Sequence, residues 1–200
     1  MQSILCALFG AAVLLSGAAC SGDDKTNKED DTLAKLRANT EVRTEDGKII
    51  TRYDENGDGN PEVTKYYKEI PDKDDPSVII RRIEKMEMDI NSDGQINVIR
   101  HYGPLGKLES EEMDHDLNGS IDLISYYDGG ELVRKEVFAA GTTRPSIVRH
   151  YSAGKVLRVE QDTNGDGKID YWEYYEQGTL DRIGRDFNAD GRADSWQTDR

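Results

Sequence analysis

The sequence predicts an all-β protein: a meander of about six β-hairpin repeats of roughly 24 residues each, with acidic loops at one end of the strands. Three observations support this expectation. An acidic loop recurs at intervals of 24 or 25 residues over much of the chain. The segment after each loop alternates β-branched or aromatic residues with polar ones, which favours strands. Each such segment then ends at a glycine turn, so that every acidic loop falls at the same end of the sheet.

The composition indicates an acidic chain with a thin apolar core. The 200 residues include 40 Asp and Glu against 26 Lys and Arg, the formal net charge is -14, and 36% of the residues are hydrophobic. This charge repels nucleic acid, which we exclude as a partner, and it attracts divalent cations. The 10 Tyr residues recur at fixed places in the repeats, which argues against a disordered body.

The amino terminus has the features of an export signal. Ile4 to Leu15 form an uncharged apolar run that is too short to remain as a membrane-spanning helix. Small residues follow up to Ala19, and Cys20 comes next. This arrangement resembles a bacterial lipoprotein signal, which implies removal of residues 1–19 and lipidation of Cys20. An ordinary cleaved signal with a chance Cys is the alternative. Ser21 after the Cys is similar to lipoproteins sent to the outer membrane of Gram-negative cells.

Residues 20–40 are polar, and we expect them to form a flexible linker between the lipid and the body. The calcium-binding repeat domain is then expected over residues 41–200. Cys6 and Cys20 both precede this domain, so no disulfide can cross-link it. Bound metal ions would supply the cross-links that an exported protein without disulfides needs.

The stretch from Asp162 to Glu173 defines the repeated loop. Counting from Asp162, oxygen-bearing side chains stand at positions 1, 3, 5 and 9, and Gly167 at position 6 permits a sharp turn. This is the ligand order of an EF-hand calcium loop, in which the backbone carbonyl of position 7 is a further ligand. Four other loops share the pattern and begin at Asp54, Asp89, Asp114 and Asp186.

Five residues from each loop are the candidate metal ligands, and position 7 contributes its backbone carbonyl. In chain order they are Asp54, Asn56, Asp58, Asn60 and Glu62; Asp89, Asn91, Asp93, Gln95 and Asn97; Asp114, Asp116, Asn118, Ser120 and Asp122; Asp162, Asn164, Asp166, Lys168 and Asp170; and Asp186, Asn188, Asp190, Arg192 and Asp194.

Calcium is the cofactor that this ligand set favours, because Ca²⁺ is a hard cation that binds about six to eight oxygens. No cluster of Cys and His accompanies the loops, which argues against zinc or copper. The alternative is that Asp, Asn and Gly only form turns, and five loops with one pattern weaken that alternative. The loop at Asp89 has only two carboxylates at these positions, so we expect it to bind most weakly.

The flanks of the loops are predicted to be strands rather than the helices of a true EF-hand. A loop of about a dozen residues and two helices of about ten do not fit a repeat of 24. The flanks, such as Ile169 to Tyr175, are β-branched and aromatic. In a strand, Glu173 lies about 10 Å beyond Asp170, so we do not expect both to bind the same ion.

The repeat has two irregularities. The unit expected near Phe138 has lost its acidic residues but keeps the flanking pattern, so we interpret it as a degenerate repeat. Ile70 to Ser77 is an insertion that lengthens one connection. Because both faces are partly apolar, we expect the sheet to coil or to fold over on itself, and an open twisted sheet, a barrel-like closure and a solenoid are all left open.

No catalytic site is predicted. His101 and His150 occupy a repeat position where other units have Tyr, and His115 stands at a variable loop position. The sequence has no GxSxG motif, no HExxH motif and no phosphate-binding glycine loop. Every Asp in a regular position is already assigned to a loop, so we expect a protein that is not an enzyme.

Residues 48–196 resemble the DxDxDG-type calcium-binding repeats of secreted bacterial proteins, a likeness that implies metal binding and names no partner. We therefore expect a calcium-binding lipoprotein of the bacterial outer membrane, on its periplasmic or cell-surface face, that acts as a structural or adhesive module. One alternative is a calcium-dependent subunit of a surface enzyme complex that binds carbohydrate or protein through Trp172 or Trp196. A hydrolase is the less favoured alternative.

Overall fold

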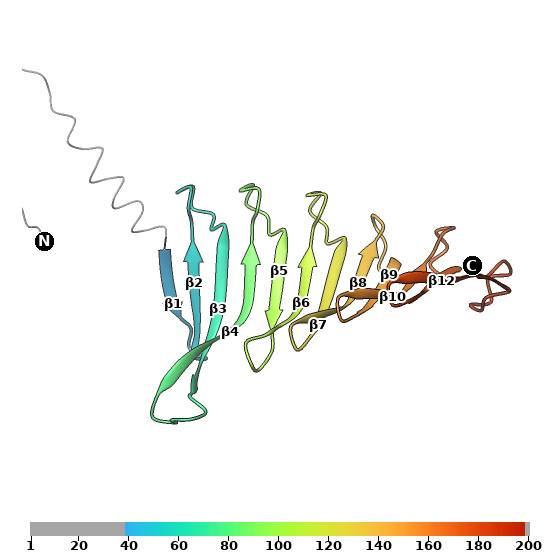
Figure 1. Cartoon of the computed structure of the whole chain (residues 1–200). Helices are drawn as coiled ribbons and strands as arrows, with labels where there is room; N and C mark the ends of the chain where they lie inside the picture. Colours follow the sequence, from blue (N-terminus) through green and yellow to red (C-terminus); the bar gives the residue numbers. More distant parts are fainter. Residues whose placement is uncertain (1–38, 199–200) are drawn as a thin grey trace, which may run out of the picture.

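The computed structural model describes residues 39–198, which form a single antiparallel β-sheet of 13 strands with the order β1 to β13 in the sheet and in the chain (Figure 1). The predicted all-β meander is therefore confirmed. The strands are β1 (Asn39–Arg43), β2 (Lys48–Tyr53), β3 (Val63–Pro71), β4 (Ile79–Met88), β5 (Val98–Tyr102), β6 (Leu108–Met113), β7 (Leu123–Asp128), β8 (Glu131–Phe138), β9 (Pro145–Ser152), β10 (Lys155–Gln161), β11 (Tyr171–Glu176), β12 (Thr179–Arg185) and β13 (Ser195–Thr198).

The expected export signal, the expected lipidation site Cys20 and nearly all of the expected linker lie outside the described residues. The sheet begins two residues before the expected domain boundary. Asn39 and Thr40, expected to be linker, belong to β1 and pair with Tyr53 and Arg52 of β2. The backbone of these two residues is therefore held by its neighbour strand.

The sheet is open. Each strand pairs only with its neighbours in the chain, and β1 and β13 form the two edges. Figure 1 shows that the strand direction rotates steadily from β1 to β13 while the sheet remains one layer. Of the three closures that the sequence left open, the open twisted sheet is the one observed, and the described strands do not fold over on themselves.

A single layer leaves little room for an apolar core. Among the described residues, the buried hydrophobic side chains are Ile49, Val98, Val148 and Val159. Most strand residues are half-buried on one of two solvated faces. Backbone ladders and cross-strand side-chain pairs must therefore provide much of the stability that a core provides elsewhere.

A β-bulge recurs in five hairpins. In each one the pairing register skips one residue of the second strand, opposite a Tyr–Tyr or His–Tyr pair of the first. The skipped residues are Glu84, Glu109, Val133, Leu157 and Asp181. Because bulges increase local twist, their regular recurrence explains why the sheet coils evenly along its length.

Glycine turns connect the strands at the end opposite the acidic loops, except between β3 and β4, where residues 72–78 contain no Gly. Three of these turns have two residues, Gly129–Gly130, Ala153–Gly154 and Gln177–Gly178, and both residues of each have positive φ. Positive φ at both positions is the requirement of a type I′ turn, which matches the twist of the strands that it joins. The insertion before β4 lengthens β3 and β4, which extend beyond their neighbours in Figure 1.

A row of polar side-chain pairs crosses one face of the sheet. Each pair brings a Tyr or His of one strand next to a Glu of the following strand. The pairs and their separations are Tyr66–Glu87 (2.6 Å), His101–Glu112 (3.3 Å), Tyr126–Glu136 (3.1 Å) and His150–Glu160 (3.3 Å). The alternation of Tyr and His in this row shows that the two residues fill the same place in the repeat.

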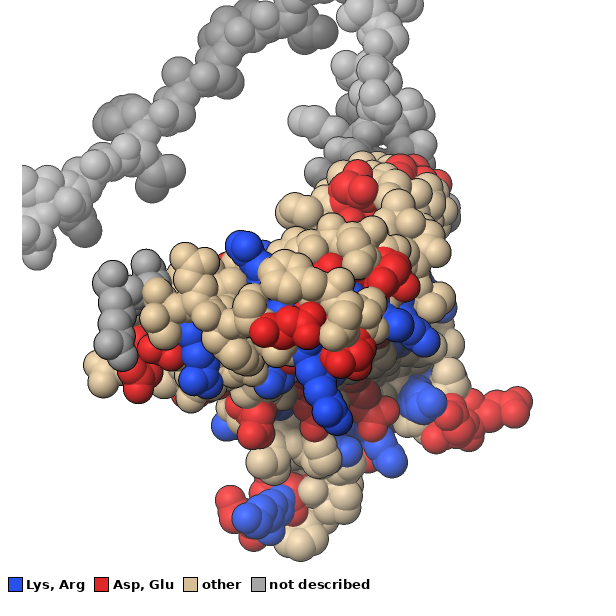
Figure 2. Space-filling view, turned by 90° about the vertical axis from the view of Figure 1, so that its right-hand side faces the viewer, with Lys and Arg blue, Asp and Glu red and all other residues tan. Residues whose placement is uncertain are grey.

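Basic side chains complete this row. Lys85 Nζ lies 2.6 Å from Glu87 Oε1 and 4.4 Å from the centroid of the Tyr66 ring. The Arg134 guanidinium lies 4.1 Å from the centroid of the Tyr126 ring. Figure 2, seen from the side of the last strands, shows basic and acidic side chains next to one another rather than in separate fields. Such paired charges allow a single layer to keep both faces in water.

We predict a late titration of Tyr66. Burial and the hydrogen bond to Glu87 raise its pKa to about 12. The protonated hydroxyl of Tyr66 therefore stabilises the fold. Its contribution is fully present below pH 10, the ordinary pKa of Tyr, and is lost as the pH rises through about 12. An alkaline titration of tyrosinate absorbance should show one late-titrating group fewer in Tyr66→Phe, and Glu87→Gln should lower the pKa of Tyr66. An unchanged titration in both variants would contradict the contact.

Candidate metal loops

Five acidic loops lie at one end of the sheet. They connect β2 to β3, β4 to β5, β6 to β7, β10 to β11 and β12 to β13, and Figure 1 shows these connections at the same end of the strands. The connection from β8 to β9, residues 139–144, lies at the same end and has no acidic residue. The meander thus gathers the predicted ligands at one end, as the sequence analysis expected.

Each loop is closed by its first Asp. The carboxylate at position 1 accepts a hydrogen bond from the backbone N–H of the Gly at position 6 in all five loops. The bonds run to Asp54 from Gly59 (3.0 Å), to Asp89 from Gly94 (2.7 Å), to Asp114 from Gly119 (2.7 Å), to Asp162 from Gly167 (2.7 Å) and to Asp186 from Gly191 (2.7 Å). The first Asp is buried or half-buried in every loop, so each loop wraps around a carboxylate.

The other predicted ligands also turn toward the interior of their loops. In the loop that begins at Asp162, Asn164 Oδ1 accepts from the N–H of Asp166 at 2.8 Å, and Asp166 Oδ1 accepts from the N–H of Lys168 at 2.9 Å. At position 9, Asp170 Oδ1 accepts from the N–H of Thr163 at 2.8 Å.

The same bonds recur in the other loops. The position-5 acceptors are Asp58, Asp93, Asn118 and Asp190, which bind the N–H groups of Asn60, Gln95, Ser120 and Arg192, and the position-9 acceptors are Glu62, Asn97, Asp122 and Asp194. At position 3 the remaining side chains are Asn56, Asn91, Asp116 and Asn188, each hydrogen-bonded to a residue of its own loop.

Position 4 carries a requirement that the sequence analysis missed. Its φ is positive in every acidic loop, at Gly57, Ser92, Leu117, Gly165 and Ala189. Only two of these five are Gly, so the signal was hidden by the variety of residue types. Ser92, Leu117 and Ala189 have φ of 56°, 60° and 60°, a left-handed conformation that side chains disfavour.

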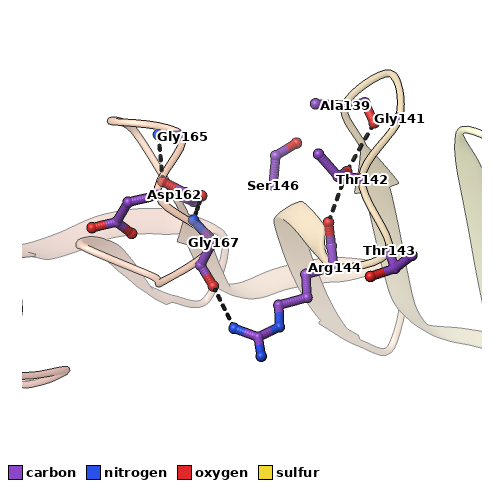
Figure 3. A pocket seen from close by; sticks show the side chains of 10 residues that line it. Ala139, Gly141, Thr142, Thr143, Arg144, Ser146, Asp162, Gly165 and Gly167 are labelled. Atoms are coloured by element: carbon purple, nitrogen blue, oxygen red, sulfur yellow. Dashed lines mark hydrogen bonds between the residues drawn. The ribbon is translucent and has the colours of Figure 1, made fainter.

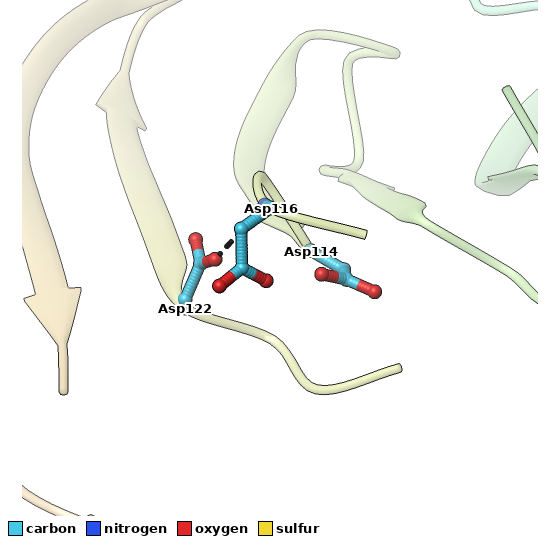
Figure 4. A group of neighbouring side chains, drawn as sticks. All are labelled: Asp114, Asp116 and Asp122. Carbon is cyan, nitrogen blue, oxygen red and sulfur yellow. Dashed lines mark hydrogen bonds between the residues drawn. The ribbon is translucent and has the colours of Figure 1, made fainter. Parts of the chain in front are cut away.

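One loop brings three carboxylates together. Carboxylate oxygens of Asp114, Asp116 and Asp122 all lie within 4.8 Å of one another (Figure 4). Asp114 is buried, Asp122 is half-buried and Asp116 is exposed. In the part of the chain that the structure describes, no Lys or Arg forms an ion pair with any of the three. An all-oxygen set with uncompensated negative charge fits a hard divalent cation.

The other loops are less converged. Within residues 39–198, the triad of Asp114 is the one group of three acidic, His or Cys side chains that meets this criterion. In the last loop, Asn188 Nδ2 donates to Asp194 Oδ1 at 2.9 Å, so that carboxylate oxygen is engaged by an amide. Carboxylate convergence therefore distinguishes the loop at Asp114 from the rest.

Hydrogen bonds tie each loop to the one before it. The N–H at position 1 donates to the C=O at position 9 of the preceding loop. The bonds run from Asp89 to Glu62 (2.9 Å), Asp114 to Asn97 (2.8 Å), Phe138 to Asp122 (2.8 Å), Asp162 to Ser146 (2.9 Å) and Asp186 to Asp170 (2.9 Å). The degenerate connection takes part through Phe138 and Ser146, so the backbone link is continuous from one end of the sheet to the other.

Glu173 lies in β11 and faces the sheet rather than the loop. Its two oxygens accept hydrogen bonds from Tyr171 Oη at 2.8 Å and Tyr175 Oη at 2.7 Å. The bond to Glu173, together with burial, raises the pKa of Tyr175 to about 12. The carboxylate is thus engaged by two tyrosines of its own strand.

Backbone N–H groups of the last loop lower the pKa of its first residue, Asp186. Burial alone would raise the pKa of Asp186, but N–H groups of Gly191, Asn188, Ala189 and Asp190 point at the carboxylate. The pKa therefore lies below its ordinary value. The loop is built for the ionised form of its first residue.

The three His residues, which the sequence analysis assigned to no site, have structural contacts. His101 and His150 belong to the row of Tyr, His and Glu pairs, and His115 donates its N–H to Asp122 within a loop. No helix that is long and apolar enough to cross a membrane is found in residues 39–198.

Comparisons with known proteins identify no family, since no family model and no curated protein matches the chain. The chain is similar to accessory secretory proteins 1, 2 and 3 of Streptococcus pneumoniae, with a TM-score of 0.29, 12% identity, and coverage of 69% of this chain and 19% of that one. It is also similar to a mutant of S. aureus TarM in complex with fondaparinux, alpha-GlcNAc-glycerol and UDP, with a TM-score of 0.32, 7% identity, and coverage of 78% and 24%. The chain spans at most 24% of these structures, and TM-scores this low carry no argument.

We predict that Leu117→Gly stabilises the protein by about 0.5–1 kcal/mol, because Gly adopts the left-handed conformation of position 4 without strain. Thermal unfolding of the metal-free protein measures the effect. Leu105→Gly is the matched control, because Leu105 is also exposed, lies in the opposite turn of the preceding hairpin and has no positive φ. Equal losses of stability in both variants would contradict the strain at position 4.

Proposed function

We propose that the protein is a calcium-binding lipoprotein of the bacterial envelope, in which calcium stiffens an array of β-hairpins that serves as a structural or adhesive module. The array consists of six repeats, five with a calcium loop and one, at Phe138, that is degenerate. The convergence of Asp114, Asp116 and Asp122 without a basic partner carries this proposal. We assign the protein no catalytic role.

The residues that would hold the ion in this loop are the three aspartates, the side-chain oxygen of Asn118 and the carbonyl of Ser120. A bound Ca²⁺ would supply positive charge where three carboxylates repel one another. Because the folded loop binds and the unfolded chain does not, this affinity becomes folding stability. With the affinity of extracellular calcium modules, a Kd of about 10⁻⁴ to 10⁻³ M, calcium at ten times Kd would add about 1.4 kcal/mol per loop.

The anchor completes the proposal. Residues 1–19 would direct export, Cys20 would carry the lipid, and the polar segment that follows would hold the sheet away from the membrane surface. We place the protein at the outer membrane on the strength of Ser21. The features that support this part of the proposal are all in the sequence.

We predict that calcium raises the melting temperature and that Asp116→Asn reduces this rise. Asp116 is exposed, so its substitution removes a carboxylate without disturbing a core. Calorimetry in excess chelator and in millimolar calcium measures both effects, and equilibrium dialysis measures the bound ion. Asp128→Asn is the control, because Asp128 is an exposed carboxylate at the opposite end of the same hairpin. Equal melting temperatures with and without calcium, together with no bound ion, would refute the proposal.

The alternative of a calcium-dependent carbohydrate- or protein-binding module has one supporting observation. Trp196 is 51% exposed, and its ring lies 5.7 Å from that of Tyr174, with the Arg182 guanidinium 5.3 Å from the Trp196 ring. Trp196 also covers Gly184, where a Cβ would lie 2.8 Å from the indole. The indole is therefore both exposed and held in place, as an aromatic contact for a sugar or peptide requires.

If the alternative holds, polysaccharides added in calcium should change the Trp fluorescence of the protein, and Trp196→Ala should abolish the change. The response should disappear in chelator. A response that survives in Trp196→Ala would assign the contact elsewhere and count against this surface.

A further inference from the structure

The side chain at position 7 of a loop extends toward the loop that follows. The side chain of Asn60 lies beside Gly94, and Oε1 of Gln95 lies 3.0 Å from the place of a Cβ on Gly119. Arg144, in the degenerate connection, donates from Nη1 to the carbonyl of Gly167 at 3.4 Å (Figure 3). In these three units, the neighbour of the position-7 side chain is therefore the next loop along the sheet.

Two of these side chains are cations directed at acidic loops. Arg144 reaches the loop that contains Asp162, Asp166 and Asp170, and Lys168 Nζ donates to the carbonyl of Ala189, at 3.1 Å, in the loop that begins at Asp186. The corresponding residues earlier in the chain, Asn60 and Gln95, are neutral. The loops that begin at Asp162 and Asp186 thus receive a basic side chain from the preceding unit, whereas those that begin at Asp89 and Asp114 receive a neutral one.

Neither cation blocks the carboxylates. In the described part of the chain, Arg144 and Lys168 form no ion pair with a carboxylate within 4.0 Å, and each binds a backbone carbonyl of the neighbouring loop instead. Both side chains are exposed, so water screens their field. At physiological salt the screening length is about 8 Å, so an opposite charge within that range still favours the folded loop.

We propose that Arg144 and Lys168 are built-in counterions, which hold the loops 162–170 and 186–194 in order without a bound ion. The degenerate unit, which has lost its carboxylates, supplies one of the two cations. The loops 89–97 and 114–122 receive a neutral side chain and have no such support. The corollary for calcium, which rests on the proposed function, is that the later loops bind calcium more weakly and depend on it less.

Hydrogen exchange of the metal-free full chain, followed by mass spectrometry, tests the counterions directly. Arg144→Gln and Lys168→Gln remove the charge and leave a shorter polar side chain, and the control below is shortened in the same way. Arg144→Gln should speed exchange about three- to tenfold in residues 162–170 only, and Lys168→Gln should do so in residues 186–194 only. The change should shrink in high salt.

Lys155→Gln is the matched control. Lys155 Nζ also donates to a carbonyl of the next hairpin, Gln177 O at 3.2 Å, but at the end opposite the acidic loops. Loss of charge there should leave both acidic loops unchanged. If Arg144→Gln and Lys168→Gln behave like Lys155→Gln, or if either one affects both loops equally, the proposal is overturned.

The corollary has a separate measurement with Tb³⁺ as the probe. The two Trp residues, Trp172 and Trp196, each lie two residues beyond position 9 of a later loop, so their excitation sensitises Tb³⁺ bound there. Lys168→Gln should raise the apparent affinity of the sensitised sites about threefold, and Lys155→Gln should not. Absence of any Tb³⁺ or Ca²⁺ binding would refute the proposed function and leave the exchange experiment to decide on the counterions.

Discussion

A sheet of one layer has no opposite layer against which to bury its side chains, and this constraint governs the rest of the molecule. Few apolar side chains are buried, so each strand is held mainly by backbone hydrogen bonds and side-chain pairs with its two neighbours. Such cross-strand pairs contribute about 0.2–1 kcal/mol each. Tyr66, Glu87 and Lys85 show the form that these pairs take: an aromatic ring, an acceptor and a cation in mutual contact. Stability is then close to a sum of nearest-neighbour terms, as in other repeat architectures.

Because each repeat contacts only its neighbours, the row of acidic loops at one end of the strands affects how well adjacent strands are held together. The link from position 1 of a loop to position 9 of the preceding one is the last backbone contact, at that end, between the two paired strands that separate the loops, such as β5 and β6. Any agent that orders one loop therefore fixes one side of the next. The acidic loops also bring like charges together. Their repulsion disfavours ordered loops unless an ion or a basic side chain compensates the charge. In our proposals, a metal ion bound in a loop and the cations Arg144 and Lys168 offset the same repulsion in two ways.

The sequence predicted the local features and missed those that depend on pairing. Strands, glycine turns and the positions of the loops follow from alternation and turn chemistry, and so does the place of Glu173 in a strand. The bulges were hidden because Glu84, Val133 and Leu157 share no property, and only the register across the hairpin exposes them. The contact from position 7 to the next loop joins residues about 22 apart, which no local pattern encodes. Whether the sheet stays open or closes likewise depends on the twist that accumulates over all strands, which no single repeat reveals.

The degenerate connection separates what the sheet needs from what the acidic residues add. It has no carboxylate, yet Gly141 keeps the positive φ of position 4, and Phe138 and Ser146 keep both backbone links to the adjacent loops. Thr142 takes over the closing hydrogen bonds, from its hydroxyl to the carbonyls of Ala139 and Arg144. A hairpin of this sheet can therefore turn and pair without any acidic residue. Turn geometry alone does not account for three carboxylates gathered at Asp114, Asp116 and Asp122, where their repulsion costs stability. A bound cation would offset this repulsion. The difference between the degenerate connection and the loop at Asp114 therefore favours metal binding over a purely structural turn.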